Sequence, residues 1–475
     1  MTEIEHRLPA VKLAPDGGRL VDYRAVLRLA LPLVGAFMVQ AIMNLVDTWF
    51  VGRLDNSVAA QAGFNAAHFP GFTFIMLFGG IGIAVQTLAA QAFGRGDRAG
   101  AAHYAWVGIA AALLIAPIFV YAAFNGEAIF TRANQPPEAT TQAAAYWTPR
   151  MLGGGVVMVY FAFNGFFNAI GRTATTLIAG LLGTGVNVIL DEILMFQLGM
   201  GMAGAGWAST IGNVVGAGFL LILFLGKRVR SEYKSTSVWR VRLRDLWVLA
   251  ALGVPMGLHM TLDIGAFAVM QLMVGSLGEV SGAATQICLM LTAMGFLPAV
   301  GLGAAGATLV GQAIGGGDAA WAKRLGYAVI KITFVYMAAV GAIFVIAGGS
   351  LAAIFVKEGT ADTATVVSLA TTLLLIAALY QAFDAFNIGC SGCLRGAGDV
   401  KVPATLLAAQ AWLFFVPLVH FLVFESGKGW IKGVPGLGMG AQGAWIAAVI
   451  HIVLFGSIML WRWHSGRWQR IKLAS

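Results

Sequence analysis

Gln91-Ala-Phe-Gly-Arg-Gly-Asp97 ends one long apolar run of the chain, and Gln312-Ala-Ile-Gly-Gly-Gly-Asp318 ends another about 220 residues later. Earlier in each half, Val51-Gly-Arg-Leu54 and Val274-Gly-Ser-Leu277 also follow an apolar run, at a similar interval. In each glycine-rich stretch the glycines are typical of a helix end, and the aspartate is expected to cap the next helix. Motifs that recur in this order and spacing indicate two similar halves.

A third echo lies late in each half, where Gly199-Met-Gly-Met-Ala-Gly-Ala-Gly206 is matched by Gly436-Leu-Gly-Met-Gly-Ala-Gln-Gly443. Both halves begin in the same orientation, so the repeat is parallel, with its axis along the membrane normal. We expect one six-helix lobe with a basic linker in residues 1–235 and a second lobe in residues 236–475. Two such bundles can rock against each other and open a central cavity to either side in turn.

The composition is that of a membrane protein. Of the 475 residues, 59% are hydrophobic and 11% are charged, and the mean hydropathy is +0.81. A water-soluble domain keeps about a quarter of its residues charged. The apolar excess here runs along the whole chain, so the surrounding solvent must be lipid. We predict an all-α integral membrane protein whose twelve transmembrane helices lie near residues 25–52, 66–92, 102–124, 146–170, 173–197, 203–226, 246–275, 282–313, 325–347, 364–394, 400–424 and 440–463.

The basic residues orient these helices. With the amino end inside, 24 of the 30 lysines and arginines fall on the inner side. The outer side holds only Arg53, Arg132, Arg150, Lys357, Lys428 and Lys432. This positive-inside pattern predicts that both termini are cytoplasmic in a plasma (inner) membrane. The net charge of +9 comes from short loops rather than from a basic stripe on a soluble module, which argues against nucleic acid as a partner.

Sequence motifs for an enzyme are missing. The three cysteines, Cys288, Cys390 and Cys393, lie in apolar stretches, and the C-x-x-C spacing of the last two is interpreted as two small residues on one helix face. The sequence has no H-E-x-x-H, no suitably placed G-x-S-x-G and no nucleotide-binding loop. We therefore expect a transporter without a cofactor, driven by an ion gradient.

Four aspartates interrupt the predicted spans: Asp47, Asp191, Asp263 and Asp384. A charged side chain at the bilayer centre costs about 2.5–3.5 kcal/mol on insertion scales, so such residues usually face a cavity and have a function. The alternative is that some of them only cap helix ends, and the role of Glu192 beside Asp191 stays open. His259, His420 and His451 stand alone in their spans and are interpreted as packing or interface residues.

Two of the aspartates are expected to meet. The spans that carry Asp47 and Asp191 both run from inside to outside, and each acid lies a few residues before its span ends. Asn187 precedes Asp191 by four residues, on the same helix face. Asn44 precedes Asp47 by three and is expected to share its face. These residues predict a polar pocket within the first bundle.

Buried carboxyl groups suit ion coupling. Burial disfavours the charged form, and two close carboxylates disfavour it further, so such a group can exchange a proton near neutral pH. A pair of carboxylates with amide and hydroxyl oxygens can equally bind sodium, a hard cation that prefers oxygen ligands. The coupling ion therefore stays open between a proton and sodium.

At these acids the sequence resembles the multidrug and toxic compound extrusion (MATE) transporters, from about residue 27 to residue 463. The resemblance rests on motifs that occur in order along the chain: Pro32 with Leu45-Val-Asp47-Thr and Val51-Gly52, Gln91…Gly94-x-Gly96-Asp97, and Tyr380-Gln…Asp384…Leu394-Arg395-Gly396-x-Gly398-Asp399. One motif departs from the family pattern: Asn168-Ala-Ile-Gly171-Arg172 replaces the usual arginine-glycine-x-glycine-aspartate turn.

The resemblance implies a V-shaped pair of six-helix lobes and the antiport of cationic or aromatic compounds against protons or sodium. In members with a buried amino-lobe site (the DinF-like pattern), the matching positions are Asp47, Asn164, Asn187 and Asp191, with Thr210 a weaker match. NorM-type members use carboxylates of the seventh and tenth helices for the coupling cation. These positions correspond here to Asp263 and Asp384, where the cation could be a proton or sodium. Asn387, one turn from Asp384, is added as a further candidate.

Two rival functions remain beside drug export. Related two-lobe exporters flip lipid-linked precursors, but such proteins often carry extra spans and a strongly cationic cavity. A passive channel needs no titrating acids. The sequence therefore favours the export of small organic cations by a protein that we expect to be a monomer in the lipid bilayer.

Overall fold

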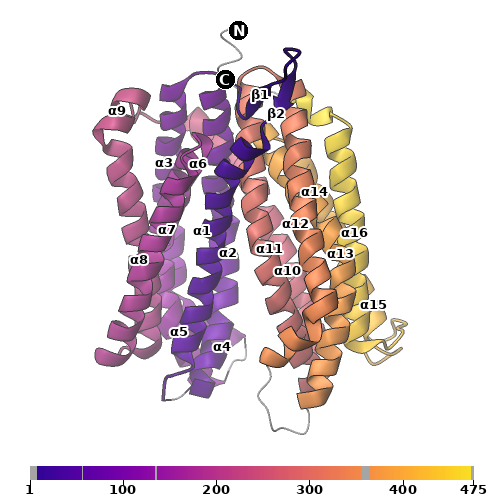
Figure 1. Cartoon of the computed structure of the whole chain (residues 1–475). Coiled ribbons are helices and arrows are strands. Elements are labelled where there is room, and N and C mark those ends of the chain that lie inside the picture. Colours follow the sequence, from indigo (N-terminus) through magenta and orange to yellow (C-terminus); the bar gives the residue numbers. More distant parts are fainter. Residues whose placement is uncertain (1–7, 56, 134–135, 356–362, 472–475) are drawn as a thin grey trace.

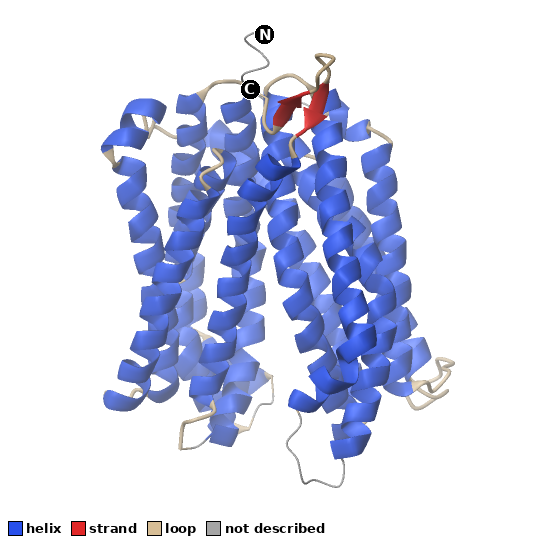
Figure 2. Cartoon of the chain, viewed as in Figure 1, coloured by secondary structure: helices blue, strands red, loops and turns tan. Residues whose placement is uncertain are grey.

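Long helices run side by side through the molecule and form two groups that lie next to each other (Figure 1). The computed structural model describes residues 8–55, 57–133, 136–355 and 363–471. Lys357, predicted on the outer side, therefore lies outside the described residues. Two short strands, β1 (Val11–Leu13) and β2 (Arg19–Val21), pair as an antiparallel hairpin. The hairpin lies near the carboxyl end of the described chain (Figure 2).

The helices of the first group run from indigo to magenta in Figure 1. They are α1 (Tyr23–Val51), α2 (Ser57–Gly94), α3 (Arg98–Phe124), α4 (Gly126–Arg132), α5 (Pro137–Leu152), α6 (Gly154–Ala169), α7 (Thr173–Asp191) with the π-helical turn η1 (Glu192–Gln197), α8 (Gly201–Leu225) and α9 (Lys227–Tyr233).

The second group continues from pink through orange to yellow. Its elements are α10 (Leu243–Gly275), α11 (Glu279–Gly315), α12 (Ala319–Ile354), α13 (Thr363–Ala397), α14 (Lys401–Gln410), the π-helical turn η2 (Ala411–Phe415), α15 (Val416–Val423), α16 (Gly440–His464) and the 3-10 turn η3 (Arg467–Arg470).

The predicted span count agrees with these helices. Within the described residues, 11 helices are long and apolar enough to cross a membrane, and the pair α5 and α6, bent by 49° at their junction, makes a twelfth span. This bent pair contains the predicted span 146–170. Several helices extend beyond their predicted ends, because hydropathy detects only the apolar part of a helix whereas polar caps and turns set its length.

The repeat is visible in the backbone. Gly96 and Gly317 both have positive φ, 82° and 84°, at the turns that follow α2 and α11. Asp97 then accepts a hydrogen bond from the backbone N–H of Gly100, and Asp318 accepts one from Trp321, each at 2.7 Å. The predicted capping role of both aspartates is confirmed.

The third echo has a different register from the one expected. Gly199 and Gly201 have φ of 66° and 51°, and the equivalent left-handed pair is Gly438 and Gly440, with φ of 66° and 60°. The matching motif is therefore G-M-G-x-x-G starting at Gly199 and Gly438, two residues later in the second half than predicted. In both halves the motif leads directly into a helix, α8 or α16.

A pair of glutamines joins the two groups at the end that holds β1 and η3. Gln91 of α2 donates its side-chain N–H to the carbonyl of Gly396 in α13, at 3.0 Å. Gln312 of α11 donates in the same way to the carbonyl of Ala169 in α6, at 2.7 Å. Each glutamine thus reaches from its own group into the other, and the two bonds are related by the repeat.

Two threonines, one helical turn from these glutamines, also donate hydrogen bonds to the opposite group. Thr87 donates to the carbonyl of Arg395 at 3.0 Å, and Thr308 donates to the carbonyl of Asn168 at 3.2 Å. Gln86 adds a bond to the hydroxyl of Thr308 at 2.9 Å. We call Thr87, Gln91, Gly94 and their counterparts Thr308, Gln312 and Gly315 the clasp.

Glycine lets the two backbones approach within the clasp. A Cβ added to Gly94 would overlap the carbonyl oxygen of Gln312, and one added to Gly315 would overlap the carbonyl oxygen of Gln91. Since the obstacle is backbone in both cases, it cannot move aside as a flexible side chain would. Small residues that permit this approach are characteristic of helix interfaces in membranes.

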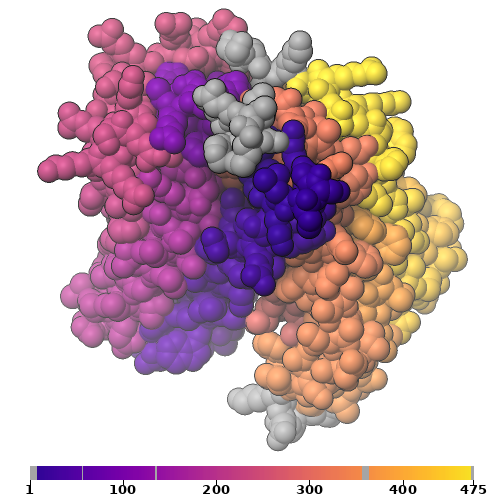
Figure 3. All heavy atoms as spheres, turned by 45° about the horizontal axis from the view of Figure 1, so that its top comes forward, coloured from indigo at the N-terminus to yellow at the C-terminus, as the bar shows by residue number. Residues whose placement is uncertain are grey.

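The groups meet at the clasp, along α2 and α10 and along α1 and α11, and their largest hydrophobic clusters separate beyond these contacts. Ala30 and Leu33 of α1 pack with Leu302 and Ala305 of α11 in one shared cluster. Two large clusters lie apart from each other: one contains only residues of α10 to α16, and the other belongs to the first group apart from two residues of α10. In Figure 3 a notch separates the purple and orange spheres at the lower edge of the view.

Replacing Gly94 with alanine should lower thermal stability. The new methyl group meets the backbone of Gln312, and overpacking of this kind costs about 1–3 kcal/mol. We expect the melting temperature of the purified protein to fall by several degrees. Gly185→Ala is the matched control, because a Cβ at that exposed helical position meets nothing within 4 Å. Equal melting temperatures for the two variants would show that the close approach is not a constraint.

Candidate functional site

Asp47 and Asp191 form the centre of a buried polar site in the first group. Asp47 lies one turn before the end of α1, and Asp191 is the last residue of α7. Their side chains face each other closely enough to interact directly. Asp47 is 2% exposed and Asp191 is 0% exposed. The structure thus brings these two predicted residues together.

Asn187 and Ser209 bind Asp47 from two neighbouring helices. The Ser209 hydroxyl donates to Oδ2 of Asp47 at 3.4 Å. With its amide oriented as the network requires, Asn187 donates to Oδ1 of Asp47 at 3.2 Å and accepts from the backbone N–H of Ser209 at 3.2 Å. Asn187 was predicted here, whereas Ser209 was not, since a serine beside Thr210 in an apolar helix gives no distinct signal.

Glu192 points away from this site. It pairs with Arg53 at 3.2 Å, and both side chains are nearly half exposed. The Arg53 guanidinium also lies over the rings of Trp49 and Phe196, at 4.7 and 4.9 Å from their centroids. The π-helical turn begins at Glu192, and such a turn changes the direction of successive side chains. Asp191 therefore faces the interior, whereas the adjacent Glu192 faces the surface.

Arg150 is a second site residue that was not predicted from the sequence. It was counted on the outer side, but it lies within α5, just before the bend, with its Nη1 atom buried and without a hydrogen-bond partner among the described residues. Its charge acts through space on Asp47 and on Tyr146. Its position inside the predicted span 146–170 was the available signal, because a cation within a span is as exceptional as an acid.

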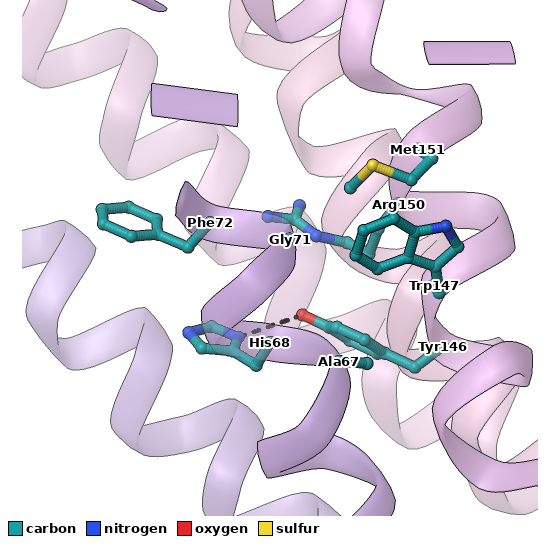
Figure 4. A pocket seen from close by; sticks show the side chains of 8 residues that line it. All are labelled: Ala67, His68, Gly71, Phe72, Tyr146, Trp147, Arg150 and Met151. Carbon is teal, nitrogen blue, oxygen red and sulfur yellow. Dashed lines mark hydrogen bonds between the residues drawn. The ribbon is translucent and has the colours of Figure 1, made fainter. Parts of the chain in front are cut away.

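A narrow pocket surrounds Arg150 (Figure 4). It lies between α2 and α5 and is too tight to hold a water molecule. The guanidinium extends between Phe72 and Trp147, and below it the ring of His68 meets the hydroxyl of Tyr146 at 3.3 Å. One cation is therefore held among aromatic side chains beside the carboxyl pair.

Thr210 performs a structural task. Its hydroxyl donates to the carbonyl of Pro149 at 2.8 Å, at the bend between α5 and α6. The same carbonyl also accepts the backbone N–H of Gly153 at 3.1 Å, so the Thr210 hydroxyl adds a second bond that fixes α8 against α5. Arg150 follows Pro149 directly, so this bond also helps to hold the guanidinium in place.

Two further predicted residues lie apart from the carboxyl pair. Asn164 donates to the carbonyl of Tyr160 in its own helix at 2.9 Å. Asn44 accepts a bond from Gln40 at 3.5 Å, one turn along α1. Neither has a described hydrogen bond to Asp47 or Asp191. Spacing by three residues from Asp47 did not bring Asn44 into the pocket.

The second group holds a separate acidic pair. Asp384 of α13 is 6% exposed and accepts a hydrogen bond from the Asn387 amide at 3.1 Å. Ser391 then donates to Asn387 at 3.4 Å. Asp263 of α10 is within electrostatic range of Asp384. The structure therefore groups Asp263, Asp384 and Asn387, as predicted, but on different helices from the first site.

The donors around these acids decide which cation fits. Asn387 turns its amide N–H toward Asp384, and Asn187 and Ser209 likewise donate to Asp47. Sodium requires oxygen lone pairs instead. No group of three or more histidine, cysteine or acidic side chains suited to a metal ion occurs within the described residues. The amide and hydroxyl hydrogens therefore stabilise the oxygens of Asp47 and Asp384.

A family model, MatE, matches residues 32–193 and 255–420, one match in each half. A protein of Bradyrhizobium diazoefficiens described as a probable multidrug resistance protein NorM is 28% identical over 467 residues, covering 97% of both chains. A protein of Burkholderia vietnamiensis described as multidrug resistance protein NorM is 27% identical over 442 residues, covering 92% of both.

Solved structures share the fold. One, described as the outward-facing conformation of a multidrug resistance MATE family transporter, has a TM-score of 0.79 at 22% identity and covers 93% of this chain and 95% of its own. Another is a MOP superfamily transporter from Pyrococcus furiosus, with a TM-score of 0.78 at 22% identity and the same coverage. Its description states that the reversed polarity of its binding pocket suggests a different function.

Replacing Thr210 with valine should destabilise the protein. The carbonyl of Pro149 keeps the backbone bond from Gly153 but loses the hydroxyl bond from Thr210, and one intramolecular hydrogen bond contributes about 0.5–1.5 kcal/mol. Thr210→Ser keeps the hydroxyl and is expected to retain most of the stability. Thermal unfolding in detergent measures both variants. If valine at this position leaves the melting temperature unchanged, the bond does not hold the bend.

Proposed function

The chain belongs to the MatE family, and on that premise we propose that it exports cationic and aromatic small molecules by antiport with protons. The observation that carries the proposal is the buried Asp47–Asp191 pair inside the first group. The names of the NorM relatives state multidrug resistance of those proteins, which supports the proposed substrate class. The chain is a multi-pass membrane protein and, as the basic residues predict, we place both termini in the cytoplasm.

The carboxyl pair is suited to hold one proton. Two neighbouring buried carboxylates cannot both stay ionised at low cost, so one proton held by the pair is the stable state. Asn187 and Ser209 donate to Asp47, and hydrogen-bond donors of this kind stabilise an ionised oxygen. The pair therefore carries one negative charge when it holds its proton and two when it releases it.

Arg150 brings the protonated site close to electrical neutrality. Its single positive charge acts on Asp47 and balances the one negative charge of the protonated pair. When the proton leaves, one negative charge remains uncompensated in a region of low dielectric constant. An organic cation restores the balance. Proton and cationic substrate then exclude each other, which is the requirement for exchange.

Protons fit this site better than sodium does. The polar groups that face Asp47 are an amide N–H and a hydroxyl that both donate to it and a guanidinium whose positive charge repels a metal ion. Asp384 likewise accepts a hydrogen bond from an amide, that of Asn387. We therefore assign the acidic pair of each helix group to proton exchange.

Transport also requires the clasp to open. The two groups are joined at the clasp and separate toward the other end, which corresponds to access from outside when the termini are cytoplasmic. Release to the outside and uptake from the inside then alternate as the groups rock. The acidic pairs argue against the lipid-linked flippase, whose anionic cargo needs a cationic cavity.

Asp47→Asn should abolish exchange. In proteoliposomes with an imposed proton gradient, ethidium movement should fall to the level of empty vesicles, because the amide can neither share a proton nor attract a cation. Glu192→Gln is the matched control, since this neighbouring acid is paired with Arg53 at the surface; it should retain most of the activity. Normal exchange by Asp47→Asn would refute the proposed site, and exchange that depends on sodium alone would refute the proposed ion.

Arg150→Met should weaken the link between proton and substrate. Without the guanidinium the protonated pair already carries an uncompensated negative charge, so an organic cation binds without displacing the proton. We expect tighter ethidium binding and a clear drop in the protons released per cation bound, measured with a pH indicator in weakly buffered detergent solution. Arg53→Met, which removes a surface arginine, should keep the proton release of the wild type. Unchanged release from Arg150→Met would remove this residue from the coupling.

A further inference from the structure

The segment between the two groups carries a concentration of basic residues that the transport site does not use. From the end of α8 through the first turn of α10 the chain holds seven lysines and arginines. We call them the basic platform, and they are Lys227, Arg228, Arg230, Lys234, Arg240, Arg242 and Arg244. The pink spheres of this region project from the upper left of Figure 3.

All seven side chains of the basic platform are exposed, and none forms an ion pair with a described residue. The acids of the segment are engaged elsewhere. Glu232 pairs with Arg98 at 3.1 Å and with Arg172 at 3.0 Å. Asp245 binds His103 at 3.1 Å and caps the start of α10. The positive charge is therefore not compensated within the segment.

The segment is held in a fixed position on the first group. The Ser235 hydroxyl donates to the carbonyl of Phe224 at 2.7 Å, and the indole N–H of Trp106 donates to the carbonyl of Ser235 at 2.6 Å. His103 meets the carbonyl of Val238 at 2.9 Å. A chain that served only as a flexible tether would not need these bonds. They present the cations on one ordered surface at the end of α3 and α8.

Apolar side chains accompany the cations. Trp239 is 58% exposed, Trp247 is 70% exposed, and Leu243 between them is also exposed. The Arg240 guanidinium lies over the Trp239 ring, 5.9 Å from its centroid. Exposed tryptophans beside arginines at the end of membrane helices are typical of the level of the lipid headgroups. The exposed tryptophans therefore place the basic platform at this level.

We propose that the basic platform binds the phosphates of anionic phospholipids in the adjoining leaflet. Clusters of four to eight basic residues next to a membrane helix favour anionic lipid surfaces, and the charge of this surface is complementary to them. The occupant must be a lipid rather than a soluble phosphate, because the tryptophans need an apolar neighbour. The platform is bonded to the first group and leads into α10, so bound lipid holds the first group at the membrane surface while the second moves.

Spin-labelled lipids provide a direct test on the full-length protein. In phosphatidylcholine vesicles, electron spin resonance measures how strongly the protein immobilises labelled phosphatidylglycerol relative to labelled phosphatidylcholine. We expect the wild type to prefer phosphatidylglycerol severalfold, with most of the preference lost in 0.5 M salt, since salt screens exposed charges. The variant K227Q/R228Q/R230Q/K234Q should lose most of the preference.

Two controls separate the proposal from a general effect of net charge. K12Q/R95Q/K401Q/R470Q removes four exposed cations at the same end of the molecule, and it should keep the preference. K227R/R228K/R230K/K234R keeps the charge of the basic platform and should also behave like the wild type. An equal loss in both glutamine variants, or no loss in the first, overturns the proposal. Lipid binding is measured without transport, so the result is independent of the proposed exchange.

Discussion

Backbone meets backbone where the two groups of helices join, and the remaining architecture depends on this contact. Lipid tails are as apolar as the side chains they touch, so helices in a membrane associate through close packing and hydrogen bonds rather than through the hydrophobic effect. Gly94 and Gly315 permit the approach, and Gln91 and Gln312 use it to reach carbonyls of the opposite group. The contact is strong in sum yet consists of separate small bonds, which suits an interface that opens and closes.

Two helices that take part in the contact between the groups, α1 and α2, also reach the site at the other end. α2 supplies Gln91 to the clasp and His68 to the pocket around Arg150. α1 packs against α11 near Leu33 and carries Asp47 four residues before its end. A charge change at the carboxyl pair thus acts on helices that reach the contact between the groups. No additional relay element is required to connect proton binding with the movement of the groups.

Patterns of hydropathy and spacing predicted the spans, the repeat, the capping aspartates and the pairing of Asp47 with Asp191. Each of these depends on residues close in sequence or on the depth of a residue in its span. Arg150 and Ser209 could not be placed in this way. Their directions depend on the bend between α5 and α6 and on how α8 packs against it. Glu192 was ambiguous for a similar reason, because only the π-helical turn decides which side it faces.

The repeat is conserved between the halves at the clasp but not at the acids. With the halves aligned on Val51 and Val274, the position equivalent to Asp47 is occupied by Met270, which is fully buried. Asp384, aligned through the clasp partners Ala169 and Gly396, has Val157 as its counterpart. The clasp is repeated in both halves and the acids are not, and these two facts have different causes. A contact that two halves share must fit from both sides, so the residues on one side constrain those on the other. A carboxyl pair lies within a single group and is under no such constraint, which leaves each group free to carry its own acids on different helices.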